Sequence, residues 1–161
     1  MENLNIEPAT ETDIPTILDF IRKLAEYEKL SQEMKATEAN LRQHLFGPDP
    51  AAEVILARLN DKPVGFALFF TTFSTFVGRP GIWLEDLFVL PENRRAGIGR
   101  ALLRSVASIA VQRNCGRLEW SVLDWNKPAV ELYQKLGATA MTDWTIQRVT
   151  GEALVRLATQ P

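Results

Sequence analysis

The sequence predicts a single mixed α/β domain over residues 1–161, and three observations predict it. Strand-like and helix-like segments follow one another in the order β-α-α-β-β-β-α-β-α-β. The early strands succeed each other directly, which is typical of antiparallel pairing. The segment 82–123 reads strand–helix–strand, which indicates one parallel pair in a central, mostly antiparallel sheet flanked by helices.

Hydrophobic periodicity and turn residues place the elements along the chain. The expected strands are residues 3–8, 54–59, 64–72, 82–90 and 117–123, with one or two more strands between residues 138 and 149. The expected helices are residues 14–29, a shorter one beginning at 37, one over 97–114, one that opens at Asn126-Lys127-Pro128 and ends before Gly137, and a closing one over 151–158.

Composition argues against several classes of protein. A formal net charge of −2 gives no reason to expect nucleic-acid binding. Cys115 is the single cysteine, so an internal disulfide is excluded and a reducing compartment is suitable. His44 is the single histidine, which leaves metal clusters and histidine-based triads without support. No apolar run approaches the ~20 residues that span a bilayer. We therefore expect a cytoplasmic protein with no metal and no nucleic-acid or membrane partner.

A basic, glycine-containing turn at residues 94–100 is the strongest functional signal. It follows an apolar strand and opens an amphipathic helix, so free backbone amides and the helix dipole form an anion site. The two glycines let a phosphate approach the backbone, and three arginines add positive charge. We expect a diphosphate held by Arg94, Arg95, Ala96, Gly97, Ile98, Gly99 and Arg100.

Three kinds of diphosphate-binding turn compete for this segment. A P-loop needs a Lys-Ser/Thr pair that is absent, and a dinucleotide fingerprint needs a third glycine where Leu102 stands. Arg94-x-x-Gly97-x-Gly99 matches the Arg/Gln-x-x-Gly-x-Gly/Ala turn of acetyl-CoA enzymes in full. The alternative is an ordinary strand–helix turn whose glycines only relieve strain. The strand before it and the helix after it favour coenzyme A.

Other segments strengthen this interpretation, and they occur in a fixed order: Pro8-Ala9-Thr10, Leu24-Ala25-Glu26-Tyr27-Glu28, Val64-Gly65-Phe66-Ala67, Leu84-Glu85-Asp86-Leu87-Phe88-Val89, Trp125-Asn126-x-Pro128 and Tyr133-x-x-x-Gly137-Ala138. With them, nearly the whole chain resembles the GNAT acetyltransferase superfamily, and within it the spermidine/spermine N-acetyltransferase subgroup, which includes thialysine acetyltransferases. The resemblance implies a homodimer. It also implies a splayed pair of parallel strands, 82–90 and 117–123, that receives the pantetheine arm of acetyl-CoA.

The resemblance implies cofactor contacts beyond the basic turn. One backbone amide near the end of the 82–90 strand is expected to stabilise the tetrahedral oxyanion. Tyr133 is expected to protonate the departing thiolate, because a tyrosine pKa near ~10 keeps the hydroxyl protonated at neutral pH. A merely packed tyrosine is the alternative. The implied cofactor residues are Leu87, Phe88, Val89, Asn126, Pro128, Ala129 and Tyr133.

Glu85 and Asp86 interrupt an apolar strand, where a carboxylate is costly unless it has a partner or a function. As neighbours on a strand, their side chains are predicted to point to opposite faces. We expect Glu85 to bind the cationic amine and to help deprotonate it through a water molecule. A buried salt bridge with an arginine is the alternative for both, and it suits Asp86 better. The resemblance implies further amine contacts at Tyr27, Glu28, Glu119, Trp120 and Ser121.

These inferences predict an acetyl-CoA-dependent N-acetyltransferase. Its substrate would be the primary amine of a small molecule, namely a diamine, a polyamine or a lysine-like amino acid, attacked directly in a ternary complex. The short turn at 60–62 and the compact stretch 139–145 differ from polyamine-directed relatives and leave room for shorter amines. Two alternatives stay open. One is a protein N-terminal or lysine acetyltransferase, and the other is a non-catalytic acyl-CoA sensor that tolerates loss of Tyr133 and Glu85.

Overall fold

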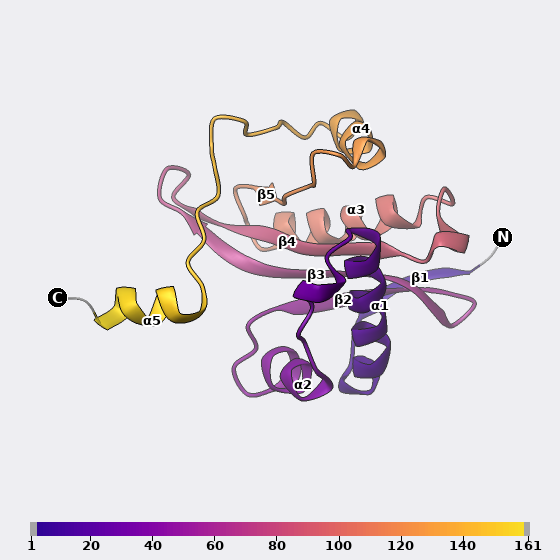
Figure 1. Ribbon diagram of the computed structural model, residues 1–161. Helices are drawn as coiled ribbons and strands as arrows, with labels where there is room; N and C mark the ends of the chain where they lie inside the picture. Colours follow the sequence, from indigo (N-terminus) through magenta and orange to yellow (C-terminus); the bar gives the residue numbers. More distant parts are fainter. Residues whose placement is uncertain (1–2, 160–161) are drawn as a thin grey trace. The chain divides into compact units, whose positions relative to one another are not determined.

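A five-stranded sheet with the strand order β1-β2-β3-β4-β5 organises the N-terminal three quarters of the fold (Figure 1). The strands are β1 (Leu4–Pro8), β2 (Glu53–Leu59), β3 (Lys62–Ser74), β4 (Arg79–Val89) and β5 (Leu118–Glu119). The first four pair antiparallel, and β5 pairs parallel with β4. The predicted mixed sheet with one parallel pair is therefore confirmed.

The computed structural model describes residues 3–159, which divide into two compact units. The first unit ends at Ser121 and contains the sheet together with α1 (Ile14–Tyr27), α2 (Glu38–Phe46) and α3 (Ile98–Gln112). The second unit begins at Val122 and contains α4 (Lys127–Lys135) and α5 (Gly151–Thr159). No helix within residues 3–159 is both long enough and apolar enough to cross a membrane.

The core of the first unit lies between α1 and one face of the sheet. Apolar side chains of α1 repeat at helical spacing and pack against alternate residues of β2, β3 and β4. Phe20 stacks on Phe66 with ring centroids 5.8 Å apart and lies at the same distance from Phe88. Helix α3 contacts the sheet on its other face, where it buries Ile98, Leu102, Leu103, Val106 and Ala110.

The start of α1 is fixed by a buried carboxylate. Asp13 accepts a hydrogen bond from the Thr10 backbone amide at 2.9 Å and forms an ion pair with Arg58 of β2 at 2.6 Å. Arg58 also pairs with Glu7 of β1 at 2.6 Å. The network joins β1, β2 and the first turn of α1. It therefore ties the start of α1 to two strands of the sheet.

Strand β4 carries an extra residue relative to β3. Leu68 pairs with Asp86 and Phe69 pairs with Leu84, so Glu85 has no partner on β3 and forms a β-bulge. Leu68 belongs to the core beneath α1, which places Asp86 on that face. Trp83 pairs with Phe70, two residues from Leu68, and lies on the same face. The bulge therefore changes the alternation of β4 at one point.

Two predictions about strands need correction. The strand expected over 117–123 is only Leu118–Glu119, and none of residues 138–149 forms a strand. The apolar side chains of Met141, Trp144 and Ile146 are exposed. An alternating pattern forms a strand only where a neighbouring strand supplies backbone partners, and the described part of the second unit contains none. The closing helix begins at the predicted residue, Gly151.

Candidate active site

The turn between β4 and α3 leaves helix amides without intramolecular acceptors. The first helical bond runs from the Ala101 amide to the Gly97 carbonyl at 2.9 Å, and no side chain caps the helix. The amides of Ile98, Gly99 and Arg100 therefore stay open to an anion. Gly97 has a φ of 80°, which favours glycine, and an added Cβ there would meet nothing within 4 Å. The turn fits the diphosphate that its sequence predicts.

Three arginines surround this helix end. Arg95 adopts a φ of 65°, which is uncommon for a residue with a side chain. Arg94, Arg95 and Arg100 are exposed, and none of them forms an ion pair with a carboxylate within residues 3–159. No acidic residue lies in the first turn of α3. The local charge is therefore positive although the chain as a whole is slightly acidic.

Arg94 has a second set of contacts away from the helix end. Its Nε donates to the Val89 carbonyl at 3.0 Å. Its guanidinium carbon lies 4.7 Å from the centre of the Tyr27 ring and 5.7 Å from the centre of the Phe88 ring. Tyr27 is the last residue of α1. The turn that begins α3 is thus joined to the end of α1 by a cation–π contact.

The edge of β4 that faces β5 is open over its second half. Only Ile82 and Trp83 pair with β5, whereas β4 continues to Val89. The Leu90 amide donates to Val64, so alternation directs the polar backbone groups of Val89 and Leu87 away from β3. The Val89 carbonyl already accepts a hydrogen bond from the Nε of Arg94. The Val89 amide and both polar groups of Leu87 therefore lie along the open edge, as the splayed pair requires.

The bulge brings two acidic side chains to the face of the sheet beneath α1. Glu85 accepts a hydrogen bond from the Trp83 indole at 2.8 Å, and Asp86 lies on the same face by its pairing with Leu68. The prediction of opposite faces is therefore wrong, because it assumed an uninterrupted strand. The expected arginine partner of Asp86 is also absent, since no ion pair within residues 3–159 includes this carboxylate.

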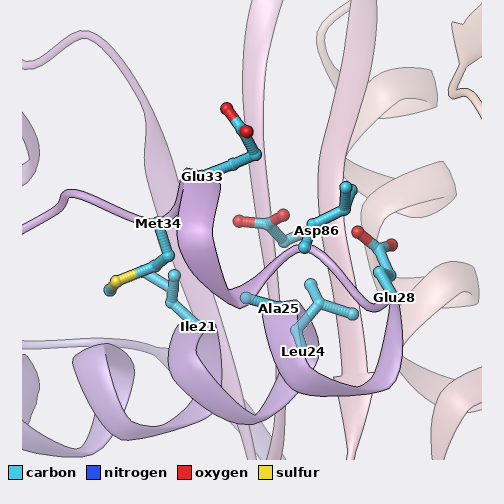
Figure 2. A pocket seen from close by; sticks show the side chains of 8 residues that line it. Ile21, Leu24, Ala25, Glu28, Glu33, Met34 and Asp86 are labelled. Atoms are coloured by element: carbon cyan, nitrogen blue, oxygen red, sulfur yellow. The ribbon is translucent and has the colours of Figure 1, made fainter.

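Asp86 lines an open pocket of about 180 Å³ between β4 and the end of α1. In Figure 2 the carboxylates of Glu28, Glu33 and Asp86 lie above the side chains of Ile21, Leu24 and Ala25. Burial, together with the charges of Glu85 and Glu28, raises the pKa of Asp86 to about 7. Burial and the charge of Glu85 also raise the pKa of Glu28. The full lining is Ile21, Leu24, Ala25, Glu28, Leu30, Glu33, Met34 and Asp86.

These raised pKa values show that the pocket disfavours several negative charges at once. A cation that enters it would stabilise the ionised carboxylates and would be attracted in return. No lysine, arginine or histidine lines the pocket. Its chemistry therefore suits an ammonium group with a short apolar stem. No cluster of metal-ligating side chains was found within residues 3–159.

Comparison with known proteins identifies the fold and the class of enzyme. The acetyltransferase (GNAT) family profile matches residues 17–138. The chain belongs to the GNAT acetyltransferase family. It is therefore an acetyltransferase, and enzymes of this family use acetyl-CoA as co-substrate, which agrees with the open amides of the turn. The resemblance seen in the sequence is confirmed.

Individual relatives of this GNAT acetyltransferase cover nearly its whole length. It is 41% identical to a thialysine N-epsilon-acetyltransferase of Sus scrofa, over 98% of this chain and 99% of the relative. It is 31% identical to an L-ornithine N5-acetyltransferase of Arabidopsis thaliana, over 92% of this chain and 85% of the relative. Among solved structures, an integron cassette protein of V. cholerae matches with a TM-score of 0.80 and 27% identity, over 98% of both chains.

The remaining predicted residues of this GNAT acetyltransferase lie in two places. Glu119 ends β5 and pairs with Arg117 at 3.0 Å, and Trp120 and Ser121 close the first unit. Asn126, Pro128, Ala129 and Tyr133 all belong to the second unit. Asn126 is the N-cap residue of α4 without a side-chain cap bond, Pro128 lies in its first turn, and Tyr133 is half-buried on the same helix. Their part in the active site stays a prediction.

Sequence reasoning missed three features of the site. It did not single out Glu33 or Met34, which follow α1 and line the pocket. The acidic residues in the segment after α1 were the available signal for Glu33. It also missed the bulge at Glu85 and the contact of Arg94 with Tyr27, because both depend on partners distant in the sequence.

Proposed function

We propose that the enzyme transfers the acetyl group of acetyl-CoA to the primary amine of a small molecule that carries a second cationic group. Diamines and lysine-like amino acids belong to this class. The observation that carries the proposal is the pocket that holds Glu28, Glu33 and Asp86 without a basic side chain. Relatives named for thialysine and L-ornithine support a lysine-like substrate.

The acetyl-CoA side of the site is built on β4 and α3. The open amides of Ile98, Gly99 and Arg100 would hold the diphosphate, and the open edge of Leu87 and Val89 would pair with the pantetheine arm. Acetyl-CoA supplies the activated acetyl group. The Val89 amide is the donor best suited to stabilise the oxyanion that forms during attack. We propose that both units act together, since the family profile spans the boundary between Ser121 and Val122.

The amine side of the site is built on β4 and the end of α1. Glu28 and Asp86 would bind the distal ammonium group, which lowers the cost of ionising both carboxylates. Glu85, oriented by the Trp83 indole, would take the proton of the attacking ammonium through a water molecule. An alkylammonium must lose that proton before it can attack, because its pKa is near ~10.4.

The reaction would then proceed by direct attack. The amine nitrogen forms a bond with the acetyl carbon, the carbon–sulfur bond breaks, and Tyr133 donates its proton to the departing thiolate. A covalent acyl-enzyme on Cys115 is not supported by its position. Cys115 follows the C-terminal end of α3, and 15 helical residues separate it from the turn, a rise of about 22 Å.

Thiol release from acetyl-CoA over a panel of acceptors tests the proposal. The panel contains 1,3-diaminopropane, putrescine, spermidine, lysine, ornithine, thialysine, propylamine and a lysine-containing peptide. We expect a dicationic or lysine-like acceptor to exceed propylamine at least tenfold in kcat/KM. Preference for the peptide would favour a protein acetyltransferase. Binding of acetyl-CoA without turnover on any acceptor would favour a non-catalytic sensor.

The cellular setting belongs to the same proposal. The family resemblance supports a homodimer, and the single cysteine supports a cytoplasmic location. Size-exclusion chromatography with light scattering would test the oligomeric state. A mass of 18.1 kDa at micromolar concentration would contradict the dimer.

A further inference from the structure

We infer that the contact between Tyr27 and Arg94 couples the amine site to the acetyl-CoA site. Tyr27 would act as a positioning residue for the acetyl-CoA site, strengthening binding through Arg94. The inference rests on the proposed function, since it assumes that the turn before α3 binds acetyl-CoA and that the end of α1 borders the amine pocket.

Arg94 is held by groups from two directions. Its Nε donates to the Val89 carbonyl at 3.0 Å, and its guanidinium lies over the ring of Tyr27 at 4.7 Å. These contacts limit the rotamers of a side chain that otherwise loses much entropy when it binds a ligand. An arginine already ordered in this way binds an anion with a smaller entropic cost.

The geometry of the contact leaves the arginine able to bind an anion. A cation–π contact uses the face of the guanidinium group, whereas its N–H donors lie in the plane. The Nε donor is used by Val89, and no carboxylate within residues 3–159 pairs with the terminal nitrogens. The ring of Tyr27 can therefore orient Arg94 while those nitrogens hold a phosphate oxygen.

Tyr27 is also connected to the amine pocket along the chain. It is the last residue of α1, and the next residue, Glu28, lines the pocket with Leu24 and Ala25. An amine bound at Glu28 would hold the end of α1 in place and with it the ring of Tyr27. Coupling between two ligands is reciprocal, so acetyl-CoA would strengthen amine binding by the same factor.

The expected size of the effect follows from the exposure of the contact. Tyr27 is 39% exposed, and a cation–π contact at such a site changes an affinity by about two- to fivefold. Titration calorimetry with coenzyme A would measure this in the full-length protein. Tyr27→Leu should weaken coenzyme A binding by that factor, whereas Tyr27→Phe keeps the ring and should stay within about 1.5-fold of wild type.

Two controls separate coupling from damage to the fold. Phe73→Leu removes an exposed ring of β3 that has no cation or ring contact among residues 3–159, and it should leave coenzyme A affinity unchanged. In an Arg94→Gln background, Tyr27→Leu should have no further effect, because its partner is already lost. Thermal unfolding of each variant shows that the binding differences are measured on folded protein.

The second measurement is amine affinity with and without coenzyme A. Wild type and Tyr27→Phe should bind the preferred amine about two- to fivefold more tightly with coenzyme A present, and Tyr27→Leu should lose this difference. Equal coenzyme A affinity of wild type and Tyr27→Leu would overturn the coupling while leaving the proposed function intact. Failure of wild type to bind coenzyme A would overturn the proposed function itself.

Discussion

Asp86 lies directly opposite Leu68 in the β3–β4 ladder, although the alternation of β4 counted from its start would place it on the other face. The reason is the unpaired Glu85 just before it. Both acidic side chains consequently share the face that α1 covers, and their mutual repulsion contributes to the raised pKa of Asp86. Burial of this pair therefore has a cost that a bound cation would lower.

Asp86→Asn should stabilise the protein more as the pH rises. The pKa of Asp86 is raised to about 7 in the folded state, so the unfolded state loses its proton first and wild-type stability falls between pH ~4 and ~7. Asparagine removes this loss. We expect the difference in the free energy of unfolding between Asp86→Asn and wild type to grow by roughly 1–3 kcal/mol from pH 4 to pH 8, measured by urea denaturation. A constant difference across this range would contradict an ionisation near pH 7.

Glu28→Gln should weaken binding of a dicationic acceptor without affecting acetyl-CoA. The variant keeps the size of the side chain but removes one of the pocket carboxylates. We expect the KM for the preferred acceptor to rise about tenfold, consistent with the loss of ~1.4 kcal/mol of charge attraction. Glu26→Gln is the matched control, because Glu26 is exposed in the last turn of α1, which Glu28 follows, and does not line the pocket. Equal effects of the two substitutions would point to general electrostatics instead of a pocket.

Substitutions of Gly97 and Gly99 should separate folding from cofactor binding. Gly97 has a positive φ, so alanine there should cost about 1 kcal/mol of stability. Gly99 is helical and its added Cβ would lie 3.7 Å from Val89, an ordinary contact, so alanine should preserve stability. We expect Gly99→Ala to bind coenzyme A within about twofold of wild type, because the Arg/Gln-x-x-Gly-x-Gly/Ala turn allows alanine at this position. Gly99→Glu, which adds a negative side chain beside the open amides, should weaken coenzyme A binding at least fivefold. Full binding by a stable Gly99→Glu variant would place the diphosphate elsewhere.

Asp13→Asn should destabilise the first unit by roughly 1–3 kcal/mol at pH 7. Burial alone would raise the pKa of Asp13, but hydrogen bonds from Thr10 and Arg58 together with the Arg58 charge lower it. This stabilisation is present above the unfolded pKa and is lost as the pH falls through the folded value. The difference in the free energy of unfolding between Asp13→Asn and wild type should therefore become smaller below pH ~4. Asp19→Asn, in an exposed pair with Lys23, should change stability by less than about 0.5 kcal/mol.

Tyr133→Phe should reduce kcat about 100-fold while coenzyme A affinity stays within twofold. The substitution removes only the hydroxyl group, which is the proton donor in the proposed mechanism. Steady-state kinetics and calorimetry on the same preparation provide both numbers. An unchanged kcat would remove Tyr133 from the mechanism and would leave its position on α4 as a packing role.

Local patterns predicted most of the first unit. The structure of the turn Arg94–Arg100 was predictable because it depends on neighbours in the sequence: a strand end, two glycines and a helix start. The helical repeat of α1 was equally local, since its apolar residues occur at a spacing that only a helix places on one face. In both cases the residues that form the feature lie within one or two turns of each other.

Features that depend on a distant partner were not predicted. The bulge at Glu85 exists only relative to β3, and the environment of Asp86 depends on Glu28, which lies far away in the sequence. The strands predicted between residues 138 and 149 do not form for a related reason, because alternation alone supplies no pairing partner. The contact of Arg94 with Tyr27 likewise joins two segments that sequence analysis treated separately.

The extra residue in β4 also bears on how this site can be redesigned. Without Glu85, the strand would alternate regularly, with Leu84 and Leu87 on one face and Asp86 and Phe88 on the other. Glu85 is thus an insertion into an otherwise complete strand, and its side chain replaces no side chain of the hydrophobic core. A chain shortened by this one residue would keep its interior intact. Under the proposed mechanism, it would bind both substrates and lack the base between them.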